Sequence, residues 1–266
     1  MTRNVESVSD VPTQFTAAVG TVLPRLKSEQ LNAFFDAPPR REFNGRSRPT
    51  QRFKFRSDCV GVTVLEGGNE LTAALIFEHL WRCGWLRRYK FQPFSLDQLD
   101  LPDTTVPDAL VELSDGRHFV VEIKSAKFFT QEKRDKFDAT TALLKTRGVI
   151  QLLWTDASPL NAVVWHNTRH LQRAYRLNVE DKQRNAILAA LPDTPTLGQL
   201  MTTTELSWEL LIANVARGLF HLNLNKKFDE YADISICVNT THFEHLFGSR
   251  PDAGGWFERI SDCRVL

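Results

Sequence analysis

The chain has 266 residues, of which 42% are hydrophobic and 24% charged, so it can bury one large core or two modest ones. Its formal net charge is only +1, which excludes a protein with a positive field over its whole surface. The sequence has no apolar run of the length that a membrane helix needs and no signal-peptide core at its start, so we expect a cytoplasmic protein without membrane contact. Its four cysteines lack zinc-ligand spacing, and reduced thiols are expected.

The first 50 residues predict an appendage to the globular part. Residues 15–35 have a weak helical period, which ends at Pro38-Pro39. A basic stretch follows, with the composition of an extended arm that lies along phosphates, although a solvated linker fits it equally well. The candidate DNA contacts in this stretch are Arg46, Arg48, Arg52, Lys54 and Arg56.

Residues 53–66 are strand-like, and Gly67-Gly68 ends this strand. A helix is expected from Glu70 to Cys83, with Asn69 as its N-cap. Glu70 then lies in the first turn, where the helix dipole favours a carboxylate, whether or not it has a further role. Glu78, further along the same helix, is the competing candidate for a functional carboxylate.

A short strand is expected to end at Gln92. Its side-chain amide could hold a metal-bound water or a phosphate oxygen, or it could simply bond to the backbone.

Residues 106–125 predict a β-hairpin with an acidic end. Two strand-like segments, 106–113 and 118–124, flank the turn residues 114–116. With Gly116 in the left-handed conformation, a three-residue loop pairs Leu113 with Arg117 and sets Asp108 opposite Glu122. Because side chains alternate along a strand, Asp108, Glu122 and Lys124 share one face and are expected to line a cleft. The other face carries the apolar residues expected in the core: Ala109, Val111, Phe119, Val121 and Ile123.

Two carboxylates about a strand spacing apart provide the hard oxygen ligands that Mg²⁺ prefers. A neighbouring lysine can orient or deprotonate an attacking water and offset charge in a phosphorane-like transition state. The alternative is an ordinary hairpin with a solvated charged face. The arrangement, Pro107-Asp108 followed by Glu122-Ile123-Lys124, resembles the PD-(D/E)xK nuclease signature.

Over roughly residues 40–175, the order of motifs resembles one family within that group, the TnsA endonucleases of cut-and-paste transposons. The matching motifs are Phe55-Arg56-Ser57, Glu70-Leu71, Phe91-Gln92-Pro93, Pro107-Asp108 and Glu122-Ile123-Lys124. The resemblance implies a restriction-endonuclease-like mixed sheet flanked by helices. It also implies that Glu70, Asp108 and Lys124 are catalytic, with Glu122 beside the metal. Glu70, Asp108 and Glu122 would bind Mg²⁺, with Mn²⁺ as a substitute.

The rest of the chain continues this pattern. A helix over 127–145, a strand over 149–154 and a helix over 167–176 are expected to complete the nuclease domain. Helices over 181–191, 196–201 and 205–217, followed by strands over 219–224 and 234–238, predict a C-terminal winged helix. Its third helix would carry Glu205 and Glu209 and little positive charge, which favours partner binding over base readout.

The expected organisation is therefore an appendage with a basic arm (1–50), a nuclease domain (51–177) and a winged-helix-like domain with a tail (178–266). The expected function is metal-dependent hydrolysis of the 5′-strands at the ends of a transposon in double-stranded DNA. The resemblance implies two partners, a TnsB-like transposase for the 3′-strands and a TnsC-like AAA ATPase regulator. A stand-alone restriction-like or repair nuclease is one alternative, and a catalytically inert DNA- or partner-binding adaptor is another.

Overall fold

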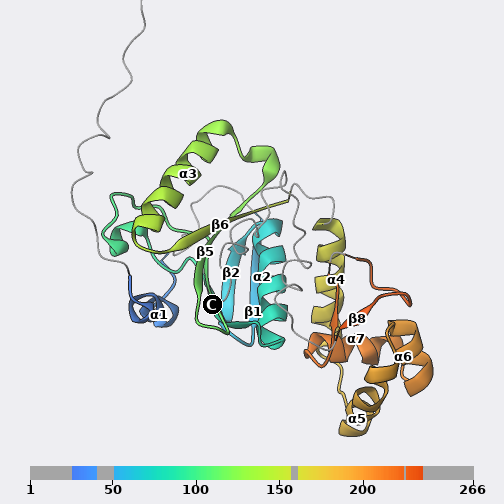
Figure 1. The fold of residues 1–266 in the computed structure, drawn as a ribbon. Helices are drawn as coiled ribbons and strands as arrows, with labels where there is room; N and C mark the ends of the chain where they lie inside the picture. The colour runs from blue at the N-terminus through green and yellow to red at the C-terminus, as the bar shows by residue number, and fades with distance from the viewer. Residues whose placement is uncertain (1–25, 41–50, 157–160, 225, 236–266) are drawn as a thin grey trace, which may run out of the picture.

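The structure is a computed structural model that describes residues 26–40, 51–156, 161–224 and 226–235 (Figure 1). Its centre is a four-stranded sheet with the order β3-β4-β5-β6, in which β6 runs parallel to β5 and the other neighbours are antiparallel. The strands are β3 (Leu86–Phe91), β4 (Ala109–Leu113), β5 (His118–Lys124) and β6 (Ile150–Thr155). Helices cover both faces, so the predicted mixed sheet flanked by helices is confirmed.

The β4–β5 hairpin has the predicted register. The backbone N–H of Leu113 donates to the carbonyl of Arg117 at 2.8 Å, and Gly116 adopts a φ of 87° in the turn. Ala109 pairs with Val121, which sets the preceding Asp108 level with Glu122. The turn therefore brings the acidic end of the hairpin together as the sequence predicts.

Apolar side chains are buried on both faces of the sheet. One face packs against α2 (Gly68–Arg82) and α4 (Asn161–Ala174). On the other face, Leu110 and Val120 are completely buried in a second apolar cluster, together with residues of α1 (Ser28–Asp36), the 3₁₀ turn η1 (Leu96–Leu99) and α3 (Gln131–Thr146). The expectation that the charged face lines a cleft is therefore wrong for the middle of the hairpin, and for its acidic end it stays a prediction.

The predicted single strand over 53–66 is instead a hairpin of β1 (Arg52–Ser57) and β2 (Gly61–Glu66). The Ser57 hydroxyl accepts hydrogen bonds from the backbone N–H groups of Cys59 and Val60, both at 2.9 Å. These bonds stabilise a turn that the pattern of polar and apolar residues in the sequence does not indicate. The predicted N-cap of α2 is also wrong, because Gly67 occupies the cap position and α2 begins at Gly68.

Three later helices differ from prediction at their starts. Thr130 caps α3, so this helix starts four residues later than expected, after the short 3₁₀ turn η2 (Ala126–Phe128). Helix α4 begins six residues earlier than expected, at Asn161. Ser207 caps α7, and Glu205 adopts a left-handed φ of 55° after α6. The prediction that Glu205 belongs to the third C-terminal helix is therefore wrong.

Within residues 178–224 and 226–235, the structure shows three α-helices and one short pair of strands. The elements there are α5 (Asp181–Ala190), η3 (Leu191–Asp193), α6 (Leu197–Thr204), α7 (Trp208–Ala216), β7 (His221–Leu222) and β8 (Ile234–Ser235). The two strands pair antiparallel. The rest of the expected strand over 234–238 lies outside the described residues, as do Arg46 and Arg48.

Helix α4 connects the sheet to the C-terminal helices. It lies between α2 and α7 (Figure 1), and one apolar cluster extends from the sheet through Leu171 to Leu211 and Ile212 of α7. The boundary expected at residue 178 therefore lies between two parts that share a core. In the described part of the chain, every helix is too short or too polar to cross a lipid bilayer.

Candidate active site

Lys124 lies between two carboxylates at the end of the central hairpin. Its Nζ is 3.1 Å from Oδ2 of Asp108 and 2.5 Å from Oε1 of Glu122. Asp108 Oδ2 also accepts a hydrogen bond from the backbone N–H of Ile123 at 2.7 Å. Both carboxylates are largely buried, whereas about a third of the Lys124 side chain is exposed, so solvent reaches this cluster from the lysine side.

Glu70 contributes a third carboxylate from the first turn of α2. Its Oε2 accepts a hydrogen bond from the backbone N–H of Glu66 at 2.8 Å, which fixes its direction. Burial raises the pKa of Glu70 to about 7, and the negative charges of Asp108 and Glu66 also act to raise it. The hydrogen bond from the Glu66 N–H and the positive charge of Lys124 act to lower it, but they are outweighed. Because Asp108 and Lys124 both act on it, Glu70 belongs to the same electrostatic cluster.

Glu122 and Lys124 shift each other's pKa in opposite directions. Burial and the neighbouring Asp108 raise the pKa of Glu122 to about 7, although Lys124 lowers it. Burial alone would lower the pKa of Lys124, but Asp108 and Glu122 outweigh it and raise that pKa above its ordinary value. In this arrangement Lys124 is therefore an ammonium ion that donates hydrogen bonds to both carboxylates.

Glu78, the competing candidate, has a structural role. It is completely buried and accepts hydrogen bonds from Ser57 Oγ at 2.7 Å and Tyr89 Oη at 2.5 Å. Arg82 pairs with it at 3.0 Å. These contacts fasten α2 to the β1–β2 turn and to β3, and they satisfy the carboxylate, so Glu70 is the carboxylate that α2 presents to the site.

Gln92 holds the backbone beside Asp108. It has a left-handed φ of 48° directly after β3, a conformation that is costly for a residue other than glycine. Its N–H donates to the Asp108 carbonyl at 2.9 Å, and its carbonyl accepts from the Arg40 N–H at 3.0 Å. Within the described residues its side-chain amide has no hydrogen-bond partner, so the predicted role of this amide toward a ligand stays a prediction.

Asp156 lies at the edge of the site and was not predicted from the sequence. It accepts hydrogen bonds from Asn69 Nδ2 at 3.0 Å, Ser125 Oγ at 3.0 Å and the Ala126 N–H at 2.6 Å. Burial acts to raise its pKa, but these hydrogen bonds outweigh burial and lower it. The sequence feature that could have identified Asp156 is its position directly after β6, since the carboxyl ends of parallel strands meet at one edge of a sheet.

The donor chemistry of the cluster suits a hard cation. In the described ranges, no three His, Cys, Asp or Glu side chains are grouped closely enough to hold a metal ion. Mg²⁺, however, commonly binds through one or two carboxylates and keeps several waters. Asp108 and Glu122 meet that requirement, and the ammonium of Lys124 now neutralises them.

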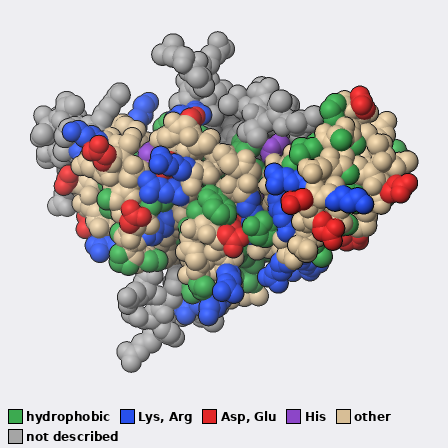
Figure 2. All heavy atoms as spheres, turned by 90° about the horizontal axis from the view of Figure 1, so that it is seen from below, with side chains coloured by type: hydrophobic (Ala, Val, Ile, Leu, Met, Phe, Trp, Pro, Cys, Tyr) green, Lys and Arg blue, Asp and Glu red, His purple; other side chains and the backbone are tan. Residues whose placement is uncertain are grey.

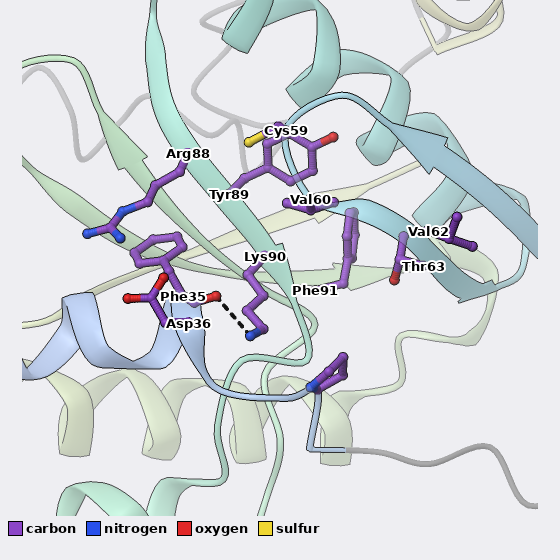
Figure 3. Close-up of a pocket in the computed structure, with 11 residues that line it drawn as sticks. Phe35, Asp36, Cys59, Val60, Val62, Thr63, Arg88, Tyr89, Lys90 and Phe91 are labelled. Atoms are coloured by element: carbon purple, nitrogen blue, oxygen red, sulfur yellow. Dashed lines mark hydrogen bonds between the residues drawn. The ribbon is translucent and has the colours of Figure 1, made fainter.

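A hollow of about 350 Å³, separate from this cluster, lies between α1, the β1–β2 turn and β3 (Figure 3). Its cations already have partners in the protein. Lys90 Nζ donates to the Phe35 carbonyl at 3.0 Å, and Arg88 lies over the Phe35 ring and bonds to Glu112 at 2.5 Å. These contacts attach α1 to β3, and they account for the positive charges of Lys90 and Arg88 without a ligand.

The candidate DNA contacts within the described chain lie on β1. Arg52 is 3.9 Å from Glu66, whereas Lys54 and Arg56 are exposed to solvent. The chain matches no protein-family model and no curated protein, so its activity has to be inferred from the geometry of the Asp108, Glu122, Lys124 and Glu70 cluster.

Proposed function

We propose that this protein is a metal-dependent DNA endonuclease of the PD-(D/E)xK type with a restriction-endonuclease-like core. The observation that carries the proposal is the position of the Lys124 ammonium within 3.1 Å of Asp108 and 2.5 Å of Glu122, at the acidic end of a hairpin. Glu70 adds a carboxylate from the adjoining helix. Phosphodiester hydrolysis needs this combination of acidic oxygen ligands and a fixed positive charge.

Asp108 and Glu122, with Glu70 beside them, would hold Mg²⁺, for which Mn²⁺ could substitute. When bound, such an ion supplies Lewis-acid chemistry at a phosphate oxygen. Lys124 would turn from the carboxylates toward the scissile phosphate and donate to the negative charge that develops there. Its partial exposure leaves room for this movement. The N–H of Ile123 keeps Asp108 in place during the exchange.

The biological setting that we propose is cleavage of the 5′-strands at transposon ends, together with a TnsB-like transposase and a TnsC-like ATPase. The order of the elements supports it: the hairpin, a charged helix, a parallel strand and a closing helix, then three helices and a short strand pair. We propose that α5, α6, α7, β7 and β8 form a winged-helix-like module for partner binding. The exposed Glu209 at the start of α7 suits a basic protein surface better than DNA.

One observation favours an inert adaptor instead. In the described residues the carboxylates are satisfied by Lys124, and no three-residue metal cluster is preassembled. An adaptor of this kind would bind DNA or a partner without cleaving either.

A nicking assay decides between these functions. Supercoiled plasmid is incubated with the full-length protein in Mg²⁺, in Mn²⁺ or in excess EDTA, with and without candidate transposase and ATPase partners. Cutting without partners supports a stand-alone nuclease, and cutting only with partners supports transposition. No cutting under any condition supports the adaptor. Undiminished cutting in EDTA would overturn the metal-dependent mechanism.

The matched variants are Asp108→Asn and Asp115→Asn, the same change at opposite ends of one hairpin. Asp115 lies in the exposed turn, where it bonds to Arg117. Asp108→Asn should abolish cleavage, and Asp115→Asn should preserve it. Equal activity of the two variants would contradict the role of Asp108.

A further inference from the structure

A groove of about 460 Å³ lies between β1 and α4, beside the start of α2. Five cations line it: Lys54, Arg56, Arg169, Arg173 and Arg176. Among the described residues, no Asp or Glu contributes to its lining. Figure 2 shows one face of the molecule, on which Lys and Arg side chains lie in several groups with Asp and Glu side chains among them. The groove is thus a local concentration of positive charge on a nearly neutral protein.

The five cations are available to a ligand. All five are exposed, and none forms an ion pair with a carboxylate of the described chain. By contrast, Arg82 pairs with Glu78 and Asp58, Arg88 with Glu112, and Arg147 with Asp100. These three arginines are therefore bound to carboxylates, whereas the groove cations have no carboxylate partner among the described residues.

The spacing of the cations suits a row of phosphates. Arg169, Arg173 and Arg176 follow one another at four and three residues, so they lie on one side of α4 and its last turn and extend about 10 Å along the helix axis. On β1, Lys54 and Arg56 are two residues apart and point to the same side of the strand. Since one DNA strand has a phosphate about every 3.4 Å along the axis, the row on α4 spans about three phosphate spacings.

The floor of the groove is apolar and aromatic. Phe53, Leu71 and Trp165 line it, and the guanidinium of Arg169 lies 5.1 Å from the centre of the Trp165 ring. Cations along an aromatic floor are typical of sites that contact a nucleic-acid backbone and also stack against bases. An inorganic anion would make no stacking contact with these aromatic rings.

The lining of the groove includes the start of α2, the helix that also carries Glu70. Gly68, the first residue of α2, is among the lining residues, and Glu70 follows two residues later. The N-terminus of α2 also favours phosphate through its free N–H groups and its dipole.

We propose that this groove binds the phosphates of one DNA strand next to the scissile bond and guides that strand into the Asp108, Glu122 and Lys124 site. This inference rests on the proposed nuclease function and assigns the path of its substrate to β1 and α4. The acidic start of α7 takes no part in this path.

The test measures binding and cleavage separately. Fluorescence anisotropy of a labelled 20-mer, as a single strand and as a duplex, is recorded over a range of salt concentrations in EDTA, where no cutting occurs. The variant Arg169→Gln/Arg173→Gln should weaken binding by about tenfold or more and reduce the salt slope by about 1.8, because two phosphate contacts are lost. Lys54→Gln/Arg56→Gln, on the opposite wall, should have a similar effect.

The matched control is Lys182→Gln/Arg184→Gln, two exposed cations on α5 with the same change in net charge. It should change the affinity less than twofold. Equal losses in the control and the groove variants would overturn the proposal, because net charge alone would then explain binding. Polyglutamate that competes as effectively as DNA at equal charge would also overturn it, in favour of an acidic protein partner.

The two proposals fail in different ways. If the protein never cuts DNA but the groove variants lose DNA binding in EDTA, the groove assignment holds and the nuclease proposal fails. If the groove variants bind and cut like the wild type, the groove assignment fails and the nuclease proposal holds. Thermal unfolding of each variant verifies that it remains folded at the assay temperature.

Discussion

Replacement of Glu70 by glutamine should stabilise the protein at alkaline pH. The pKa of Glu70 rises from its usual 4.5 to about 7 in the folded protein. Each pKa unit corresponds to about 1.4 kcal/mol, so the ionised carboxylate costs the native state about 3 kcal/mol. Glutamine fills nearly the same volume, and its oxygen can still accept the hydrogen bond from the Glu66 N–H.

The sign of the effect follows from proton binding. Below pH 4.5 Glu70 is protonated in both the folded and the unfolded protein, and the variant gains nothing. Between pH 4.5 and 7 the unfolded chain releases the proton while the folded protein retains it, so the wild type loses stability as the pH rises. The gain from Glu70→Gln should therefore grow from near zero at pH 4.5 to about 3 kcal/mol above pH 7.

Urea unfolding at several pH values between 5 and 9 measures this difference. The matched control is Glu209→Gln, which also removes a carboxylate from the first turn of a helix but at an exposed position. It should cost a few tenths of a kcal/mol up to about 1 kcal/mol through the helix dipole. If Glu70→Gln is less stable than the wild type at pH 8, the conclusion that Glu70 is held in a desolvated acidic cluster is wrong.

Three further predictions concern the charge network and the shared core. Lys124→Met leaves Asp108 and Glu122 without their cation, so it should lower the unfolding free energy by about 1–3 kcal/mol at pH 8, less at pH 5, and abolish plasmid nicking. Glu78→Ala removes a buried carboxylate from four donors and should cost about 3–5 kcal/mol in urea unfolding; a loss below 1 kcal/mol would argue against its structural role. Deletion of residues 178–266 exposes the side of α4 that packs on α7. Calorimetry should show a lower melting temperature for residues 1–177 than for the full chain, and an unchanged value would show that the two parts fold independently.

The sequence predicted the hairpin and its register because these depend on local chemistry. A turn with one left-handed glycine and strict side-chain alternation determine which residues face each other, and Leu113 does pair with Arg117. The acidic end of the hairpin followed from the same alternation. The first-turn position of Glu70 was also predictable, since Gly67-Gly68 ends the preceding strand.

Other features depend on contacts between distant residues. The turn that separates β1 from β2 is stabilised by Ser57, whose hydroxyl is held in turn by Glu78. Asn69 lies inside α2, and its side chain donates a hydrogen bond to Asp156, 87 residues away. The early start of α4 and its packing on α7 likewise depend on contacts that only the three-dimensional structure shows. Pattern and propensity report such long-range contacts poorly.

The turn of the central hairpin provides a point for engineering. Asp115 and Gly116 lie at the end of β4 and β5 that is opposite the carboxylates, five strand residues or about 17 Å away, and Asp115 is exposed. A protease site inserted between them would allow the connection between β4 and β5 to be cut while pairing with β3 and β6 still holds the two strands in the sheet. The same position could accept a ligand-binding domain, so that activity would depend on an added small molecule.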